Sequence, residues 1–167
     1  MKWLGAAVCF LVSVVIGWKA GKKEQERTAE CEAFLSLFDH IQNQVGYFAA
    51  PTKQIYRNLE NEVLARVGFL EALSAHEHDE VYFDVWASAL SACEDRLHLS
   101  ECQLDIVRSF GACIGKSNEE LQLKKMAYYA RELASETEKQ RSEMKKNIKV
   151  YRTLGFAIGA ATVLLAI

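Results

Sequence analysis

The chain has 167 residues with one proline and nine glycines, and its mean hydropathy is near zero. This composition fits one helical domain with membrane segments and leaves little material for a β-sheet. The formal net charge is −2, and the acidic residues concentrate between Gln54 and Phe110, which disfavours a nucleic-acid partner.

The first predicted element is a helix over residues 1–18, whose segment from Trp3 to Trp18 carries no charge. As a helix this segment is roughly 23 Å long, against about 30 Å of bilayer hydrocarbon. We interpret it as an uncleaved transmembrane helix; a cleaved signal peptide, a core helix and an interfacial helix remain alternatives. A signal peptide is disfavoured because Lys19 follows at once and no small-x-small cleavage site precedes it.

An amphipathic stripe then predicts a long helix that continues the first run and ends near Gly46 and Pro51. Its apolar positions are Cys31, Phe34, Leu35, Phe38, Ile41 and Val45. Four shorter helices are expected next. They are one from Thr52 or Lys53 through Leu59 and Val63, one over residues 67–73, one capped by Asp79, and one running from the capping box Ser100–Gln103 to Ile114 and ended by Gly115.

The last predicted helix begins at the capping box Ser117–Glu120 and runs without interruption into a second uncharged segment, residues 153–167. Its stripe comprises Leu123, Met126, Ala130, Leu133, Thr137, Met144, Ile148 and Tyr151. We therefore predict an all-α protein: an antiparallel bundle of about six helices over residues 19–152, with its two longest helices continuous with short transmembrane helices at both ends.

The basic residues predict the orientation of this chain in a membrane. Lys19, Lys22 and Lys23 follow the first run and Lys149 and Arg152 precede the second, whereas only Lys2 lies on the far side. The positive-inside rule places residues 19–152 in the cytoplasm of a two-pass membrane protein. The basic ends of the bundle would face anionic lipid, and the acidic region between Gln54 and Phe110 would be available to a basic protein.

Five cysteines occur without a C-x-x-C pair, so neither a disulfide framework nor a zinc site is indicated. Cys9, Cys31, Cys93, Cys102 and Cys113 are expected to be small buried residues in a reducing cytoplasm. His76 and His78 lie close together in sequence, but His40 and His98 have no ligand spacing, and a metal site needs three or four ligands. We expect no metal or cofactor.

Gly111 to Ser117 resembles a phosphate-binding loop, but three residues separate its glycines where that loop has four, and Phe110 occupies a glycine position. One helix ending and the next beginning explains the same residues. The sequence contains no constellation of acid, base and nucleophile. We therefore expect a non-enzyme without a small-molecule substrate.

Trp86 lies on a helical stripe, which favours a core residue over the alternative of a docking anchor for a partner. In the uncharged segments, Gly155 and Gly159 form a G-x-x-x-G pattern that permits close helix pairing. Gly5 and Gly17 would supply the opposite surface, although small residues are common in transmembrane helices generally.

Two motifs resemble the stage III sporulation protein AB family. Phe110, Gly111, Ile114, Gly115, Asn118 and Gln122 resemble its F-G-x-x-L-G-x-x-D…Q segment, and Tyr151 to Gly155, with Leu154, resembles its Y-R-x-L-G end. The chain departs from the family at Ile114, at Asn118 and at Pro51, which lacks the flanking glycine and leucine of the family's Gly-x-x-Pro-Leu.

The resemblance implies a mother-cell membrane protein of the sporulation apparatus, with a cytoplasmic helical bundle similar to that of the type II secretion platform protein. It also implies two kinds of partner, a secretion-type ATPase (stage III sporulation protein AA-like) and ring-forming channel proteins. The expected function is therefore a non-enzymatic platform that couples the ATPase to the channel. The alternative is a membrane-tethered helical sensor or ligand-binding bundle, in which Trp86 and the His76–His78 loop would matter.

Overall fold

The computed structural model describes the backbone of residues 2–48, 59–75, 82–115 and 119–166, and the side chains of residues 22–46, 59–75, 84–115 and 120–146. The described residues contain no strand. They form α1 (Lys2–Phe48), α3 (Glu62–Arg66), α4 (Phe69–Ser74), α5 (Tyr82–Cys93), the 3-10 helix η1 (Glu94–Arg96), α6 (Glu101–Gly111) and α7 (Glu119–Ala166). The prediction of an all-α bundle is confirmed.

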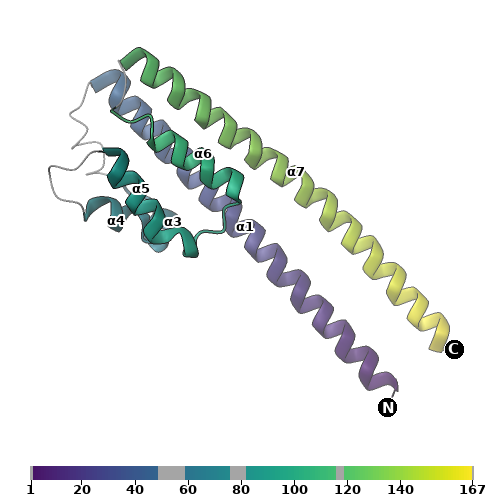
Figure 1. Ribbon diagram of the computed structural model, residues 1–167. Helices are drawn as coiled ribbons and strands as arrows, with labels where there is room; N and C mark the ends of the chain where they lie inside the picture. The colour runs from purple at the N-terminus through teal and green to yellow at the C-terminus, as the bar shows by residue number, and fades with distance from the viewer. Residues whose placement is uncertain (1, 49–58, 76–81, 116–118, 167) are drawn as a thin grey trace.

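The two long helices organise the molecule (Figure 1). Helices α1 and α7 run antiparallel and side by side, so both termini lie at the same end. Helix α6 packs on α7 and touches α1, whereas α3 and α4 lie on the far side of α1, away from α7. Helix α5 joins these layers, because it contacts both α4 and α6. The short helices therefore form a head at the end opposite the termini.

An aromatic cluster holds this head together. The rings of Phe38 from α1 and Phe110 from α6 are stacked, with an interplanar angle of 2° and centroids 3.6 Å apart. Trp86 from α5 meets Phe69 from α4 edge-on, with centroids 5.2 Å apart. Phe34 also meets Phe69 edge-on, with the same distance of 5.2 Å between centroids. All five rings are completely buried, so burial and aromatic geometry together fix α1, α4, α5 and α6 relative to one another.

The amphipathic stripes of α1 and α7 are confirmed where the side chains are described. Cys31, Phe34, Phe38 and Ile41 of α1 are buried, as are Met126, Leu133 and Thr137 of α7. The α-helical period of both segments was therefore sufficient to identify the faces that meet. The start of the last predicted helix, at Ser117, lies outside the described residues.

The predicted second helix is wrong at Leu59, because residues 59–61 are not helical and α3 begins only at Glu62. The reason is local: the Asn61 side chain accepts hydrogen bonds from the backbone N–H groups of Val63 and Leu64, both at 3.1 Å, and so caps the helix there. Residues 52–58 lie outside the described part of the chain.

The next two predicted boundaries shift by a few residues. The helix predicted over residues 67–73 begins at Phe69, because Gly68 adopts a left-handed conformation with φ 82°. The capping box of Ser100 and Gln103 is confirmed at the start of α6. That helix ends at Gly111 rather than Ile114, and Gly115, with φ 76°, closes the turns that follow. Asp79 lies outside the described residues.

The structure confirms the expected burial for three of the four cysteines whose side chains are described. Cys31, Cys93 and Cys113 are buried as expected, but Cys102 is exposed, because the first turn of α6 directs it to solvent. The side chain of Cys9 is outside the described set.

Within the part of the chain that is described, none of the helices is both long enough and apolar enough to cross a membrane.

Candidate functional site

A buried carboxylate connects α1 to the segment that leads into α6. Glu30 is only 1% exposed. Its Oε2 accepts a hydrogen bond from the backbone N–H of His98 at 2.7 Å, and its Oε1 lies 2.8 Å from His98 Nδ1. Arg27 completes the connection, because its Nε donates to the His98 carbonyl at 2.7 Å. Residues 68 positions apart are thus held together at the base of the head.

A glutamine of α7 links this helix to both α1 and α6 at a neighbouring level. Gln140 of α7 donates through Nε2 to Glu24 Oε2 of α1 at 2.7 Å. Its Oε1 accepts from Gln103 Nε2 of α6 at 2.9 Å. Gln103 also accepts from the Ser100 N–H, as part of the α6 capping box. These bonds and the Glu30–His98 contact form what we call the polar tie, which fixes α6 to both long helices.

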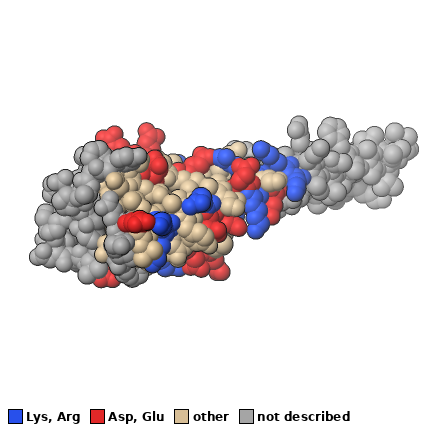
Figure 2. Space-filling model, turned by 90° about the horizontal axis from the view of Figure 1, so that it is seen from above, with Lys and Arg blue, Asp and Glu red and all other residues tan. Residues whose placement is uncertain are grey.

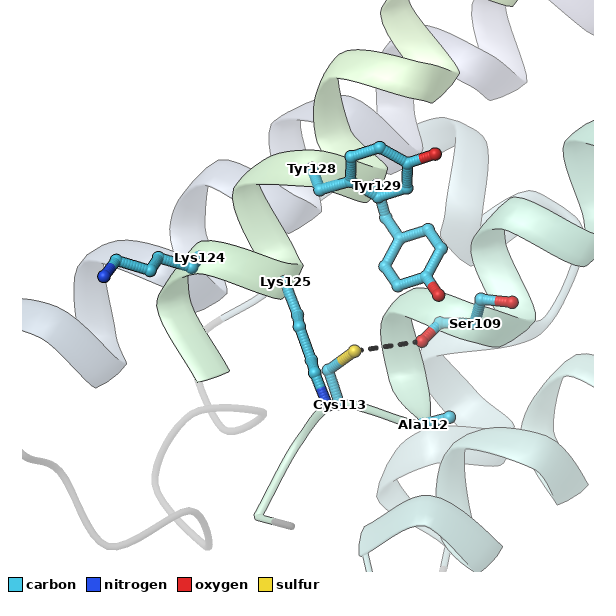
Figure 3. Close-up of a pocket in the computed structure, with 7 residues that line it drawn as sticks. All are labelled: Ser109, Ala112, Cys113, Lys124, Lys125, Tyr128 and Tyr129. Carbon is cyan, nitrogen blue, oxygen red and sulfur yellow. Dashed lines mark hydrogen bonds between the residues drawn. The ribbon is translucent and has the colours of Figure 1, made fainter. Parts of the chain in front are cut away.

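A groove lies at the other end of α6, where this helix meets the first turns of α7 (Figure 3). Its volume is about 430 Å³. It is lined by residues of α6, of the turns that follow it and of α7: Ser109, Ala112, Cys113, Lys124, Lys125, Tyr128 and Tyr129. Tyr129 and Lys125 extend from α7 toward the end of α6, whereas Lys124 points away from it.

The groove is bordered by exposed apolar surface. Tyr128 is 54% exposed and Leu121 is 47% exposed, and both lie on the outer side of α7 because their spacing of seven residues is two helical turns. Tyr128 also meets the ring of Tyr129 edge-on, with centroids 5.2 Å apart. Aromatic side chains are enriched at protein-binding surfaces, so the exposed Tyr128 favours a surface of this kind.

The groove differs in charge from the head around it. Its described lining includes two lysines and no acidic residue. The surface of α3–α6 and their connections is acidic, with three arginines against the exposed carboxylates of Glu60, Glu62, Glu71, Asp84, Glu94, Asp95, Glu101 and Asp105. The acidic region expected from the sequence therefore covers the flank of the head.

The basic residues gather toward the termini. Figure 2 shows lysines and arginines where the described surface meets the long extension of α1 and α7. They include Lys22, Lys23, Lys139, Arg141, Lys145 and Lys146. Acidic neighbours offset part of this charge, because Arg141 pairs with Glu32 and Lys139 pairs with Glu136. The basic end predicted from the sequence is thus present, with carboxylates interspersed.

Trp86 lies in the core, as its helical stripe favours, and the alternative of a docking anchor does not hold. Its side chain is 0% exposed, and its indole N–H donates to the Val107 carbonyl at 3.1 Å. It offers no surface to a partner and matches the core alternative. The family-motif residues Phe110, Gly111, Ile114 and Gln122 are buried as well. They hold α5, α6 and α7 together and form no binding surface of their own.

Other predicted residues lie where the structure describes little. His76, His78 and Asn118 are outside the described residues. Gly5 and Gly17 fall in α1, and Tyr151, Leu154, Gly155 and Gly159 fall in α7, but only the helical backbone is described there. Their membrane pairing stays a prediction. Within the described part of the chain, no group of three or more metal-ligating side chains comes together.

Two buried thiols have strongly shifted pKa values. Burial raises the pKa of Cys31 from 9.0 to about 11, although hydrogen bonding to Thr137 opposes the change. Burial likewise raises the pKa of Cys93 to about 11. Both thiols are therefore protonated at neutral pH and poor nucleophiles, which suits structural residues.

The sequence contains a signal for the buried position of Glu30. Glu30 lies four residues before Phe34, on the face of α1 that carries the core residues. A carboxylate at an apolar position of such a stripe indicates a buried polar contact. Its partner His98 has no comparable signal, because it lies in an irregular segment distant in sequence.

Comparison with known proteins gives a consistent result. A model of the stage III sporulation protein AB family matches residues 2–167. Among solved structures, the chain is similar to one described as stage III sporulation protein AB, with a TM-score of 0.60 and 16% identity, over 72% of this chain and 98% of that chain. At this identity the likeness shows a shared fold. A comparison with curated proteins finds no match.

Proposed function

This chain belongs to the stage III sporulation protein AB family, and from this premise we propose that it is a non-enzymatic assembly platform of the sporulation apparatus. A role in sporulation follows from the family. The proposal adds that the platform couples a secretion-type ATPase (stage III sporulation protein AA-like) to ring-forming channel proteins. It adds also that the protein acts in the membrane of the mother cell.

The observation that carries this proposal is the antiparallel pair of α1 and α7. Both helices extend from the head to the same end of the molecule (Figure 1). The polar tie joins them to α6 through Gln140, Glu24 and Gln103. A displacement of the head by a partner would therefore move both helix ends together, as a mechanical platform requires.

We propose that residues 1–18 and 153–167 are the membrane segments and that residues 19–152 are cytoplasmic. The absence of charge from Trp3 to Trp18 and over residues 153–167, together with the flanking lysines and arginines, supports this topology. Each of these uncharged runs is roughly 23 Å long as a helix, shorter than about 30 Å of hydrocarbon. Lys2 and Lys149 would then reach the interface with their long side chains.

The groove between α6 and α7 bears on the alternative, a membrane-tethered sensor or ligand-binding bundle. Small-molecule sites are usually enclosed and mostly apolar. This groove instead lies at the surface, with Lys124 and the half-exposed Tyr128 among its lining residues. Its character fits a protein surface better than a ligand cavity, which supports the platform.

Gene deletion tests the proposed function. Without this protein, development of the engulfed forespore should stop while vegetative growth continues normally, and a plasmid copy of the wild-type gene should restore spores. A normal spore yield in the deletion strain would contradict the proposal.

Reporter fusions test the topology separately: a reporter near Glu71 should be cytoplasmic, and one after Ile167 should lie outside.

A further inference from the structure

We propose that the groove between α6 and α7 docks an acidic amphipathic segment of a protein partner. The proposal rests on the platform function, because a platform must hold a partner on its cytoplasmic side. It assigns that role to the surface formed by Leu121, Lys124, Lys125, Tyr128 and Tyr129, which we call the α7 docking surface.

The apolar part of the α7 docking surface indicates what kind of partner it meets. Among the described residues, Leu121 and Tyr128 are the large hydrophobic side chains that stay substantially exposed, and both belong to this surface. Tyrosine supplies a large contact area with little loss of side-chain freedom, which is why it is common at binding hot spots. The partner must therefore bring apolar side chains.

The charged part of the α7 docking surface indicates the sign of the charge that the partner carries. Lys124 and Lys125 lie beside the two tyrosines, and no carboxylate is among the described residues that line the groove. Lys124 is exposed and pairs with Glu120 at 2.6 Å. No salt bridge joins Lys125 to another described side chain. Carboxylates on the partner would therefore complement the groove.

A second copy of this chain does not fit. If two α7 docking surfaces met about a two-fold axis, the lysines of one copy would face those of the other, which is repulsive. If the surface met the acidic flank of α3–α6, the exposed Tyr128 would find no substantially exposed large apolar side chain among the described residues there. A different protein that combines carboxylates with apolar side chains satisfies both requirements.

Photocrosslinking in sporulating cells tests the inference on the full-length protein. The photoreactive amino acid p-benzoylphenylalanine replaces Tyr128, which is exposed, so the fold should tolerate the change. After irradiation, mass spectrometry identifies the crosslinked peptide. The expected adduct is a segment of another protein that carries both carboxylates and apolar side chains.

Charge variants supply the matched controls. In the crosslinking strain, Lys125→Glu should lower the adduct yield at least tenfold, whereas Lys125→Arg, which keeps the charge, should preserve it. Lys139→Glu is the control for charge reversal, because Lys139 is an exposed lysine of the same helix outside the groove. Immunoblotting verifies equal amounts of each variant.

Four outcomes would each overturn the inference. They are an adduct with a second copy, an adduct with lipid, the absence of any adduct, and an equal loss of adduct yield in Lys125→Glu and Lys139→Glu. The gene deletion separates this failure from failure of the proposed function. Blocked sporulation without the expected adduct would refute the docking surface alone. The expected adduct together with normal sporulation in the deletion strain would refute the platform function alone.

Discussion

Gly111 lies so close to Trp86 that a Cβ added to this glycine would be 2.1 Å from the indole Cδ1. The backbone of α6 therefore rests directly on the ring of α5, and the indole N–H donates to Val107 one turn earlier in α6. The glycine of the family motif has a packing role here, since no side chain fits between the two helices.

Substitution of this glycine should be destabilising. Gly111→Ala must push α6 away from Trp86, and we expect a loss of about 1–3 kcal/mol of unfolding free energy, as for other overpacked cores. Gly46→Ala is the matched control. Its Cβ would meet only the flexible end of Leu123, at 3.3 Å, and the helix gains up to about 1 kcal/mol from alanine. Thermal unfolding of the purified full chain measures both, and equal stability of the two variants would contradict the packing argument.

The buried carboxylate of α1 should matter more than its exposed neighbour. Glu30→Ala leaves the partly buried His98 N–H without its acceptor, which should cost about 1–3 kcal/mol. Glu32→Ala removes an exposed carboxylate that pairs with Arg141, so we expect less than about 1 kcal/mol. Chemical denaturation of both variants provides the comparison. If Glu32→Ala proved the more destabilising, the polar tie would not stabilise the fold.

The cysteines should differ in how fast their thiols react. Cys102 is exposed and should react quickly with a maleimide at neutral pH, whereas Cys31 and Cys93 should react only when the protein unfolds. Burial blocks access to both and raises both pKa values to about 11, so little thiolate forms. Peptide mapping after timed labelling gives the three rates. Labelling of Cys31 as fast as that of Cys102 would contradict the buried position.

The same two thiols predict a loss of stability in alkaline solution. Their pKa values lie above the unfolded value of 9.0, so the native state keeps these protons while the unfolded state releases them. Their stabilising contribution is complete below pH 9.0 and declines until about pH 11, by about 1.4 kcal/mol per pH unit for each thiol. The double variant Cys31→Ala, Cys93→Ala should show a shallower decline, because the other titrating groups are unchanged. Identical slopes would exclude this origin.

Much of the fold was predictable because its signals are local. The stripe from Cys31 to Val45 and the one from Leu123 to Thr137 repeat with the helical period, and the faces they mark do meet. The capping box of Ser100 and Gln103 spans only four residues and formed as predicted.

The features that the sequence did not predict depend on tertiary contacts or on competing local ones. Ile55, Leu59 and Val63 have helical spacing, but the Asn61 side chain caps α3, so this helix begins only at Glu62. Glu30 and His98 meet only because the head folds back onto α1. The α6–α7 groove likewise depends on how these two helices pack, and no motif in either helix predicts it.

The central claim is that this protein holds a secretion-type ATPase on the cytoplasmic side of a sporulation channel. Its most direct test is co-purification of the tagged full-length chain, in detergent, from sporulating cells, with an unrelated tagged membrane protein as control. We predict that a secretion-type ATPase is recovered with this chain and is absent from the control. Recovery of intact chain at its normal level without any such ATPase would contradict the account.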